Sequence, residues 1–329
     1  MGAYRGANRT GLSRGDGGAR RRVVTVGPRL SVGIASRNRP AALARCLASL
    51  RVLDGMVEEI IVVDDGSEPA LEPEVRAILG AGAPDNLRVV RFAPSRGLAA
   101  ARSEAVPQSA SSYVLNLDDD TVVLSAGAIE AALAVLESNP DVFAVAFAQA
   151  AADGSPLPLA AQPAPVASPC FVAAFIGFAH LVRRDRFVEL GGFRAQMNLN
   201  GEERELCLRA LDRGLGVVYL PDARVAHLAD PAGRDVRRYL HLTVRNGVLS
   251  SIYDDPFLLL LVRVPVRLLA YFRMRRGLRV VDPGGFWHIL RWLRRDLREA
   301  LTQRRPVRWS TIRRWRSLTR RPEPYRGPA

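Results

Sequence analysis

The sequence predicts an α/β protein with a doubly wound, mainly parallel sheet and helices on both faces, followed by a basic helical region. Three observations support this fold class. Short apolar runs alternate with helix-like segments over residues 30–118, as strands and helices do in such sheets. Several of these runs end in polar or acidic residues, which is typical of strand ends at a ligand crevice. Beyond residue 230 the chain turns basic and the alternation stops.

The alternating elements can be assigned in chain order. Strands are recognised by short apolar runs, and helices by apolar side chains three or four residues apart. The expected elements are a strand at 30–35, a helix at 41–53, a strand at 60–63, a helix at 73–79, a strand at 87–92, a helix beginning within 96–102, and a strand from Tyr113 to Asp118. This order places Ser36, Asp65 and Asp118 at the carboxyl ends of successive strands.

Length and composition predict three regions. Residues 1–28 contain many Gly and Arg residues and no apolar segment, so we expect a disordered basic tail and no secretory signal. Residues 29–230 are expected to form one folded domain, and residues 231–329 are expected to form the basic helical region. The chain has three cysteines without metal-ligand spacing, which argues against a disulfide scaffold and indicates a reducing, cytoplasmic compartment.

The positive charge is concentrated at the two ends of the chain. Residues 231–329 contain 23 arginines and 7 acidic residues, whereas residues 30–230 contain more acids than arginines. A basic flank attracts anionic lipid or nucleic acid. No nucleic-acid recognition motif accompanies the charge, so no nucleic acid is expected. Tryptophans and leucines between the arginines suit a peripheral site on an anionic membrane, and equally suit helices that pack on the core.

Three consecutive carboxylates follow the strand that begins at Tyr113. Asp118 and Asp120 are spaced to point the same way, and Asp119 lies between them. Carboxylate oxygens at this spacing suit Mg²⁺ or Mn²⁺, which usually retain coordination positions for substrate phosphates. Taken alone, the same triplet is equally consistent with a charged turn after a strand.

Together with other short motifs in the same order, this triplet resembles glycosyltransferase family 2, whose members have the GT-A fold, and most closely its rhamnosyltransferase-like members. The resemblance spans roughly residues 29–250. The motifs that carry it are Ser36-Arg37-Asn38-Arg39-Pro40, Val63-Asp64-Asp65-Gly66-Ser67, Gly97 with Ala101-Arg102, Leu117-Asp118-Asp119-Asp120, Leu190-Gly191-Gly192-Phe193, Gly201-Glu202-Glu203-Arg204-Glu205-Leu206 and Tyr219-Leu220-Pro221-Asp222-Ala223-Arg224-Val225-Ala226-His227.

The resemblance implies a nucleotide-sugar donor site at the strand ends. Its expected members are Ser36, Arg39, Asp64, Asp65, Arg102, Asp118 and Asp119. A carboxylate such as Asp65 can accept the imide N–H of uracil or thymine, which favours a pyrimidine nucleotide, and Arg102 at a helix beginning can meet phosphate. The alternatives are a turn with a helix cap for Asp64 and Asp65, and solvated arginines for Arg39 and Arg102.

The resemblance also implies a metal ion and a base. Asp118, Asp120 and His227 are the expected ligands of Mg²⁺ or Mn²⁺. Glu203 is the expected general base that deprotonates the acceptor hydroxyl, with Glu202 as its supporting neighbour. One displacement would invert the anomeric configuration. The family usually has Asp at position 203, and acidic residues there also stabilise a helix N-terminus without any catalytic role.

The predicted function is therefore a metal-dependent, inverting transfer of one sugar from a UDP- or dTDP-sugar to an acceptor hydroxyl. A cell-envelope glycan, a glycolipid or a natural product could supply that hydroxyl. The Gln-x-x-Arg-Trp string of processive synthases is absent, since Gln303 and Arg308-Trp309 have a different spacing. The alternatives are a sugar nucleotidyltransferase of related fold and an inactive basic scaffold that binds lipid or nucleic acid. The expected location is the cytoplasm, either free or peripherally bound at the inner face of the membrane.

Overall fold

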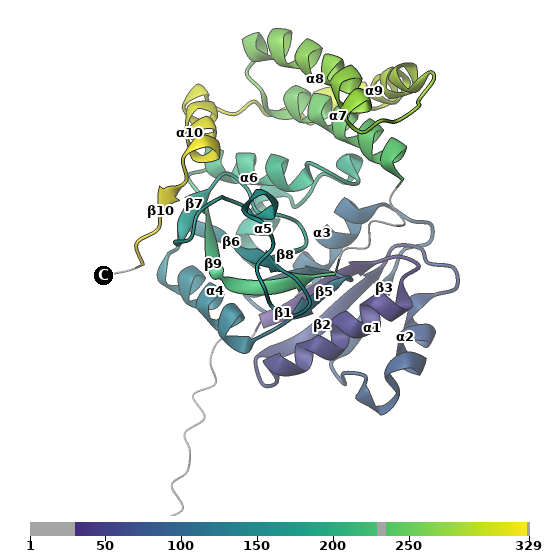
Figure 1. The fold of residues 1–329 in the computed structure, drawn as a ribbon, viewed down its shortest axis with the longest axis vertical. Helices are drawn as coiled ribbons and strands as arrows, with labels where there is room; N and C mark the ends of the chain where they lie inside the picture. The colour runs from purple at the N-terminus through teal and green to yellow at the C-terminus, as the bar shows by residue number, and fades with distance from the viewer. Residues whose placement is uncertain (1–29, 229–234, 328–329) are drawn as a thin grey trace, which may run out of the picture.

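The computed structural model describes residues 30–228 and 235–327, so the predicted tail at 1–28 lies outside the described residues. Its first part alternates strands and helices as the sequence predicts (Figure 1). The elements are β1 (Leu30–Ser36), α1 (Pro40–Ser49), β2 (Val57–Asp64), α2 (Leu71–Leu79), β3 (Leu87–Arg91), α3 (Leu98–Gln108) and β4 (Tyr113–Asp118). The helix expected to reach residue 53 ends in a 3₁₀ turn, Leu50–Leu53.

The second part of the domain contributes further strands, several of them short. Its elements are β5 (Thr121–Val123), α4 (Ala126–Ser138), β6 (Val142–Ala150), β7 (Cys170–Val172), β8 (Ala179–Arg183), α5 (Arg184–Leu190), α6 (Glu202–Asp212) and β9 (Gly216–His227). Other 3₁₀ turns occur at Gly80–Gly82, Leu159–Ala161 and Ala195–Met197. β6 is buried along its whole length, which explains why its sequence shows no polar alternation.

One mixed sheet connects both parts, in the order β10-β7-β9-β6-β8-β4-β1-β2-β3, with β5 paired to β9. β4, β1, β2 and β3 are mutually parallel, and this is the doubly wound half that the sequence predicts. β8 then runs antiparallel between β4 and β6. The α/β fold class is confirmed, and the parallel arrangement is continuous only in the first half of the sheet.

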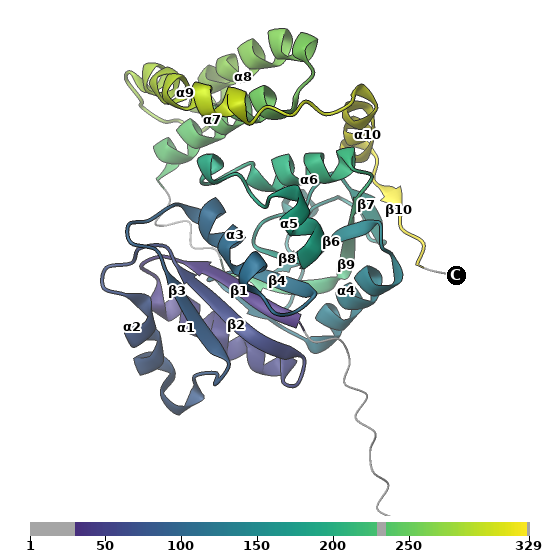
Figure 2. The ribbon, with the colours of Figure 1, turned by 180° about the vertical axis from the view of Figure 1, so that it is seen from behind.

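The sheet separates two apolar cores. On one face, α1, α2 and α4 bury side chains such as Leu47, Val75 and Leu133 against the strands. On the other face, α3, α5 and α6 do the same with side chains such as Val106 and Phe187. Figures 1 and 2 show the two faces from opposite sides. Because both faces are covered, ligands can reach the parallel strands only at their ends.

The basic region forms a helical layer beside α6, at the opposite end of the molecule from α1 and α2 (Figures 1 and 2). Its elements are α7 (Val236–Asp254), α8 (Phe257–Gly277), α9 (Gly285–Thr302), α10 (Trp309–Arg320) and β10 (Glu323–Pro324). β10 pairs with β7, so the end of this region returns to the sheet. Within the described residues, none of the helices combines the length and the apolar character needed to cross a bilayer.

Candidate active site

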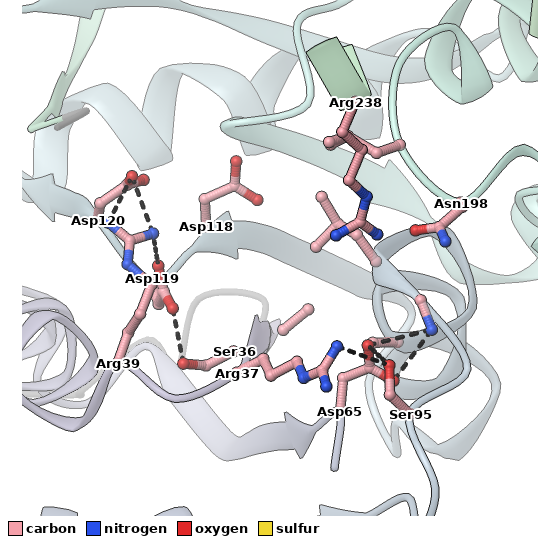
Figure 3. A pocket seen from close by; sticks show the side chains of 15 residues that line it. Ser36, Arg37, Arg39, Asp65, Ser95, Asp118, Asp119, Asp120, Asn198 and Arg238 are labelled. Carbon is pink, nitrogen blue, oxygen red and sulfur yellow. Dashed lines mark hydrogen bonds and ion pairs between the residues drawn. The ribbon is translucent and has the colours of Figure 1, made fainter. Parts of the chain in front are cut away.

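Polar side chains from three parallel strands meet in a cleft of about 270 Å³. Strand pairing aligns Ser36 of β1 with Asp64 of β2, and Ala35 with Asp118 of β4, so the residues that follow these strands share one edge of the sheet. The cleft is lined by Ser36, Arg39, Asp65 and all three acids of the Asp118–Asp120 triplet (Figure 3). The structure thus brings together most of the predicted donor residues.

Asp65 lies in the cleft with its carboxylate already fixed. It accepts hydrogen bonds from the backbone N–H groups of Arg96 and Gly97, at 2.6 and 3.0–3.1 Å, and from the hydroxyl of Ser95 at 2.7 Å. Gly97 has φ +93°, a conformation that glycine adopts without a steric penalty. The loop before α3 therefore holds the Asp65 carboxylate in place at the wall of the cleft.

The sequence predicts that Asp64 contacts the donor, but in the structure its side chain lies away from the cleft. Its side chain is buried and accepts the backbone N–H groups of Ser67 and Leu71. It does not line the cleft. The physical reason is strand alternation: successive residues at the end of β2 point to opposite sides, so only one aspartate of the pair can face the cleft. Asp64 instead fixes the turn that leads into α2.

Asp119 organises the base of the cleft. It accepts hydrogen bonds from the hydroxyl of Ser36 and from Arg39, both at 2.6 Å, and Arg39 also pairs with Asp120 at 3.1 Å. Burial raises the pKa of Asp119 to about 7, although the contacts with Ser36 and Arg39 oppose this shift. Ser36 and Arg39, both predicted to contact the donor, thus hold the triplet in place while also lining the cleft.

Asp118, Asp120 and His227 form a cluster with metal-ligand geometry. One ligand atom from each lies within 4.8 Å of the others, and β5 brings this about because Thr121 pairs with His227 on β9. His227 Nε2 is 3.5 Å from Asp120 Oδ1, a buried oxygen with no hydrogen-bond partner. Although burial opposes it, His227 and Arg39 lower the pKa of Asp120 to about 2, which keeps it ionised. Two carboxylates and an imidazole fit Mn²⁺ or Mg²⁺.

Gln149, which the sequence does not single out, orients His227. Its side-chain oxygen lies 2.6 Å from His227 Nδ1, and an amide oxygen can only accept there. Nδ1 therefore carries a proton, and Nε2 faces Asp120. Phe178 stacks on the same imidazole, with ring centroids 5.0 Å apart. Such support of a histidine from behind is a recurrent feature of metal sites. The apolar pattern of β6 gave no signal for it.

Arg102 contacts three carboxylates and does not line the cleft. Its guanidinium donates two short hydrogen bonds to Asp118, at 2.6 and 2.7 Å, and others to Glu202 at 2.9 Å and Glu203 at 3.4 Å. The side chain is only 6% exposed. The sequence predicts a phosphate contact for this residue, but in this structure its donors face carboxylates, because α3 directs Arg102 beneath the cleft toward the beginning of α6.

The acidic pair at the beginning of α6 is split by burial. Glu202 is fully buried. One of its carboxylate oxygens accepts a hydrogen bond from Arg102, and the other has no hydrogen-bond partner among the described residues. Burial and the neighbouring Glu203 raise the pKa of Glu202 to about 8. The Glu203 side chain remains 17% exposed. Gly177 lies directly over the pair, since a Cβ there would be 2.2 Å from Glu203 Oε1 and 2.6 Å from an Arg102 nitrogen. Glu203 is therefore the more accessible member of the pair, although it does not line the cleft.

Asn198 and Arg238 also line the cleft, and the sequence predicts neither. Figure 3 shows Arg238 entering from the side opposite the Asp118–Asp120 triplet. Arg238 belongs to α7, so the basic helical region supplies part of the cleft wall. In a chain with this many arginines, nothing in the sequence distinguishes Arg238 from the others.

Comparison with known proteins agrees with this geometry. Residues 31–186 match the family described as glycosyl transferase family 2. The chain is 31% identical over 210 residues to the pre-mycofactocin glycosyltransferase of Mycobacterium tuberculosis strains CDC 1551 and H37Rv. That alignment covers 60% of this chain and 42% of the relative, so the chain spans less than half the length of the curated relatives it matches.

Solved structures with the same fold include three glycosyltransferases. The mannosyltransferase PcManGT from Pyrobaculum calidifontis, in complex with GDP-Man and Mn²⁺, has a TM-score of 0.56 at 16% identity, covering 89% of this chain and 87% of that one. GalNAc-T7 with UDP, GalNAc and Mn²⁺ has 0.56 at 17%, covering 83% and 57%. TarS 1–349 from S. aureus has 0.54 at 16%, covering 89% and 90%. Residues 31–186 therefore match glycosyltransferase family 2, and the likenesses to solved structures show that the chain has the GT-A fold.

Proposed function

We propose that this protein transfers a single sugar from a pyrimidine nucleotide-sugar to an acceptor hydroxyl, with a divalent metal ion and with inversion at the anomeric carbon. The observation that carries the proposal is the cluster of Asp118, Asp120 and His227 at the edge of a cleft that also contains Asp65. This arrangement places a cation site and a carboxylate acceptor in one cleft, as a nucleoside diphosphate with a base requires.

The choice of a pyrimidine rests on Asp65. Its carboxylate is held by the N–H groups of Arg96 and Gly97 at the wall of the cleft, and a carboxylate oxygen is a suitable acceptor for the single imide N–H of uracil or thymine. The related structures contain GDP-Man in one case and UDP in another, which supports a nucleotide-sugar without selecting the base. The chemistry of Asp65 favours UDP- or dTDP-sugars.

Asp118, Asp120 and His227 would hold the metal ion, either Mn²⁺ or Mg²⁺. When bound, the ion would neutralise the charge that develops on the departing nucleoside diphosphate. The protein contributes the orientation of His227 through Gln149. It also holds Asp118 in one rotamer through two hydrogen bonds from Arg102, so little reorganisation is needed when the donor binds.

Glu203 is the proposed general base. It is the less buried member of the acidic pair, whereas Glu202 is enclosed beside Arg102. Glu203 would take the proton of the acceptor hydroxyl as its oxygen attacks the anomeric carbon and the diphosphate leaves from the opposite side. A single displacement of this kind inverts the anomeric configuration and forms no covalent bond to the protein. The acceptor classes remain a glycan, a glycolipid or a natural product, the last in line with the name of the mycobacterial relative.

We also propose that the protein works in the cytoplasm, at the inner surface of an anionic membrane. The apolar face of α8 supports this proposal, and we define it as seven side chains that are 47–68% exposed: Phe257, Leu258, Leu261, Val262, Val266, Leu269 and Phe272. α8 forms the outer edge of the helical layer (Figures 1 and 2). Exposed arginines at 273, 275 and 276 follow this face directly, which suits anionic headgroups.

The experiment that tests the reaction is donor binding and hydrolysis across UDP-, dTDP- and GDP-sugars, with Mn²⁺, Mg²⁺ or chelator. We expect metal-dependent binding of one pyrimidine donor, lost in Asp120→Ala. Asp222→Ala is the matched control, because Asp222 is an exposed residue of β9 away from the cleft. The anomeric configuration of a product, read by NMR, tests inversion. Binding of no nucleotide-sugar under any metal would overturn the proposal.

A further inference from the structure

A second cavity lies between α7 and α9, directly beside the donor cleft. Its volume is about 820 Å³, which is large enough for a small molecule. Asn198 and Arg238 line both this cavity and the donor cleft. The two spaces are therefore adjacent, and a molecule in the second cavity would lie next to the donor.

Aromatic side chains form one wall of the cavity. Trp287 and Trp292 line it five residues apart on α9, together with His288. The rings of His288 and Trp292 are 4.5 Å apart, and Trp287 is 68% exposed. An indole left open to solvent beside a cavity is a suitable platform for a flat ring or a sugar face, because ring stacking buries a large apolar area with fixed geometry.

The cavity also has an uncompensated positive charge. Its two acids are already used: Asp282 bonds His241 at 2.6 Å and Tyr271 at 2.8 Å, and Asp235 caps α7. Arg237 lies 3.6 Å from Asp282. Arg238 and Arg291 are exposed and have no acidic partner among residues 30–228 and 235–327. Two guanidinium groups without a counter-ion favour an anionic ligand.

We propose that this cavity binds the acceptor, and that the acceptor carries an anionic group next to a ring. Arg291 would hold the anion and Trp287 would stack on the ring, while Arg238 lies between acceptor and donor. This inference rests on the proposed glycosyl transfer, and it adds the substrate class and its place. The basic helical region then has a role in selecting the acceptor, in addition to its contact with a membrane.

Calorimetric titration with three probes tests the proposal. Phenyl phosphate has both features, inorganic phosphate has only the charge, and benzyl alcohol has only the ring. We expect phenyl phosphate to bind more tightly than either of the others, and Arg291→Gln and Trp287→Ala each to weaken it about tenfold, the scale of one charge-assisted hydrogen bond. Vesicles that contain polyprenyl phosphate form a parallel arm, which tells whether a lipid or a soluble molecule supplies the anion.

Matched controls distinguish this cavity from general electrostatics. Arg298→Gln removes the same charge from an exposed position of α9 outside the cavity, and Trp309→Ala removes an indole, 47% exposed, from α10. Both should bind phenyl phosphate as the unchanged protein does. Equal weakening by Arg298→Gln, or phenyl phosphate binding no better than phosphate, would overturn the proposal. UDP binding with Mn²⁺, measured on the same samples, tests the donor site separately. If the unchanged protein binds phenyl phosphate but not UDP, the transferase function is contradicted and ligand binding in the second cavity is not.

Discussion

At the scale of single residues, the site depends on side chains that hold other side chains. Gln149 fixes the proton of His227 on Nδ1, and Arg102 holds both oxygens of Asp118. Substitution of Gln149 should therefore lower the metal affinity, and substitution of Arg102 should lower the stability, although neither residue lines the donor cleft.

Gln149→Leu removes the acceptor for the His227 proton and keeps a side chain of similar size. We expect Mn²⁺ affinity, measured calorimetrically in the presence of UDP, to fall about 10- to 100-fold, as is typical when the partner of a metal-bound histidine is lost. Gln149→Glu retains an oxygen acceptor and should restore most of the affinity. If the leucine and glutamate variants bind Mn²⁺ equally well, Gln149 does not orient His227.

Arg102→Met removes a buried charge and keeps the length of the side chain. Asp118, Glu202 and Glu203 would then lose their common cation, and we expect the free energy of unfolding to fall by about 3–5 kcal/mol. Urea denaturation measures it. Arg88→Met is the control, because Arg88 is 44% exposed and 3.5 Å from Glu59, so it should cost less than about 1 kcal/mol. Similar losses in both variants would contradict the role given to Arg102.

At the scale of elements, close approach of two segments sets the position of Glu203, the proposed base. The loop before β8 crosses the beginning of α6 at Gly177, where there is no room for a Cβ. The need for glycine at this position comes from the tertiary structure, because the atoms that a Cβ would meet belong to Arg102 of α3 and Glu203 of α6. The same loop continues into Phe178, which packs on His227, so it contacts both halves of the site.

Gly177→Ala should displace Glu203 or Arg102 while the protein stays folded. We expect turnover of the donor and acceptor to fall at least about tenfold, since a Cβ 2.2 Å from Glu203 Oε1 displaces the carboxylate by about 1 Å and a misplacement of that size can cost about 100-fold. Gly127→Ala is the matched control. A Cβ at Gly127 would meet only Ser125 Oγ, at 3.5 Å, and alanine there favours the α4 helix. Unchanged turnover in Gly177→Ala would place the base elsewhere.

At the scale of the whole molecule, charge and apolar surface are concentrated in the helical layer. The basic region contains 23 of the 47 arginines, and the apolar face of α8 lies in the same layer. β10 and α10 return to the domain, where Ile312 packs with Leu208 and β10 pairs with β7. The carboxyl end of the layer is thereby fastened to the sheet, and a surface that binds α8 would hold the donor cleft at a fixed distance.

Leu261→Asp combined with Leu269→Asp places two charges on the apolar face of α8. We expect this variant to lose sedimentation with vesicles that contain anionic lipid, and the unchanged protein to be released as salt increases. Ile78→Asp is the control, because Ile78 is 54% exposed on α2 and should not affect sedimentation. Normal sedimentation of the double variant would contradict the membrane proposal. A dimer that the unchanged protein forms and the variant does not would show that a second copy, and not the membrane, covers this face.

The sequence by itself determined the parallel half of the fold and the chemical types at its strand ends. Local patterns suffice there, because each buried strand is a continuous apolar run and its last residues are forced to one edge of the sheet. Asp65, Asp118 and Asp120 could be identified in this way, whereas His227 is implied only by the resemblance to glycosyltransferase family 2. The structure places these residues around one cleft and one candidate metal site.

Only the tertiary structure decided which groups face each other across long separations. Arg102 meets carboxylates, and Gln149, Gly177 and Arg238 join the site. No local pattern encodes these contacts, since each joins elements that lie apart in the chain. The antiparallel strands and the second cavity have the same origin, because short strands and helix faces acquire their partners only when the chain closes into a sheet with a helical layer beside it.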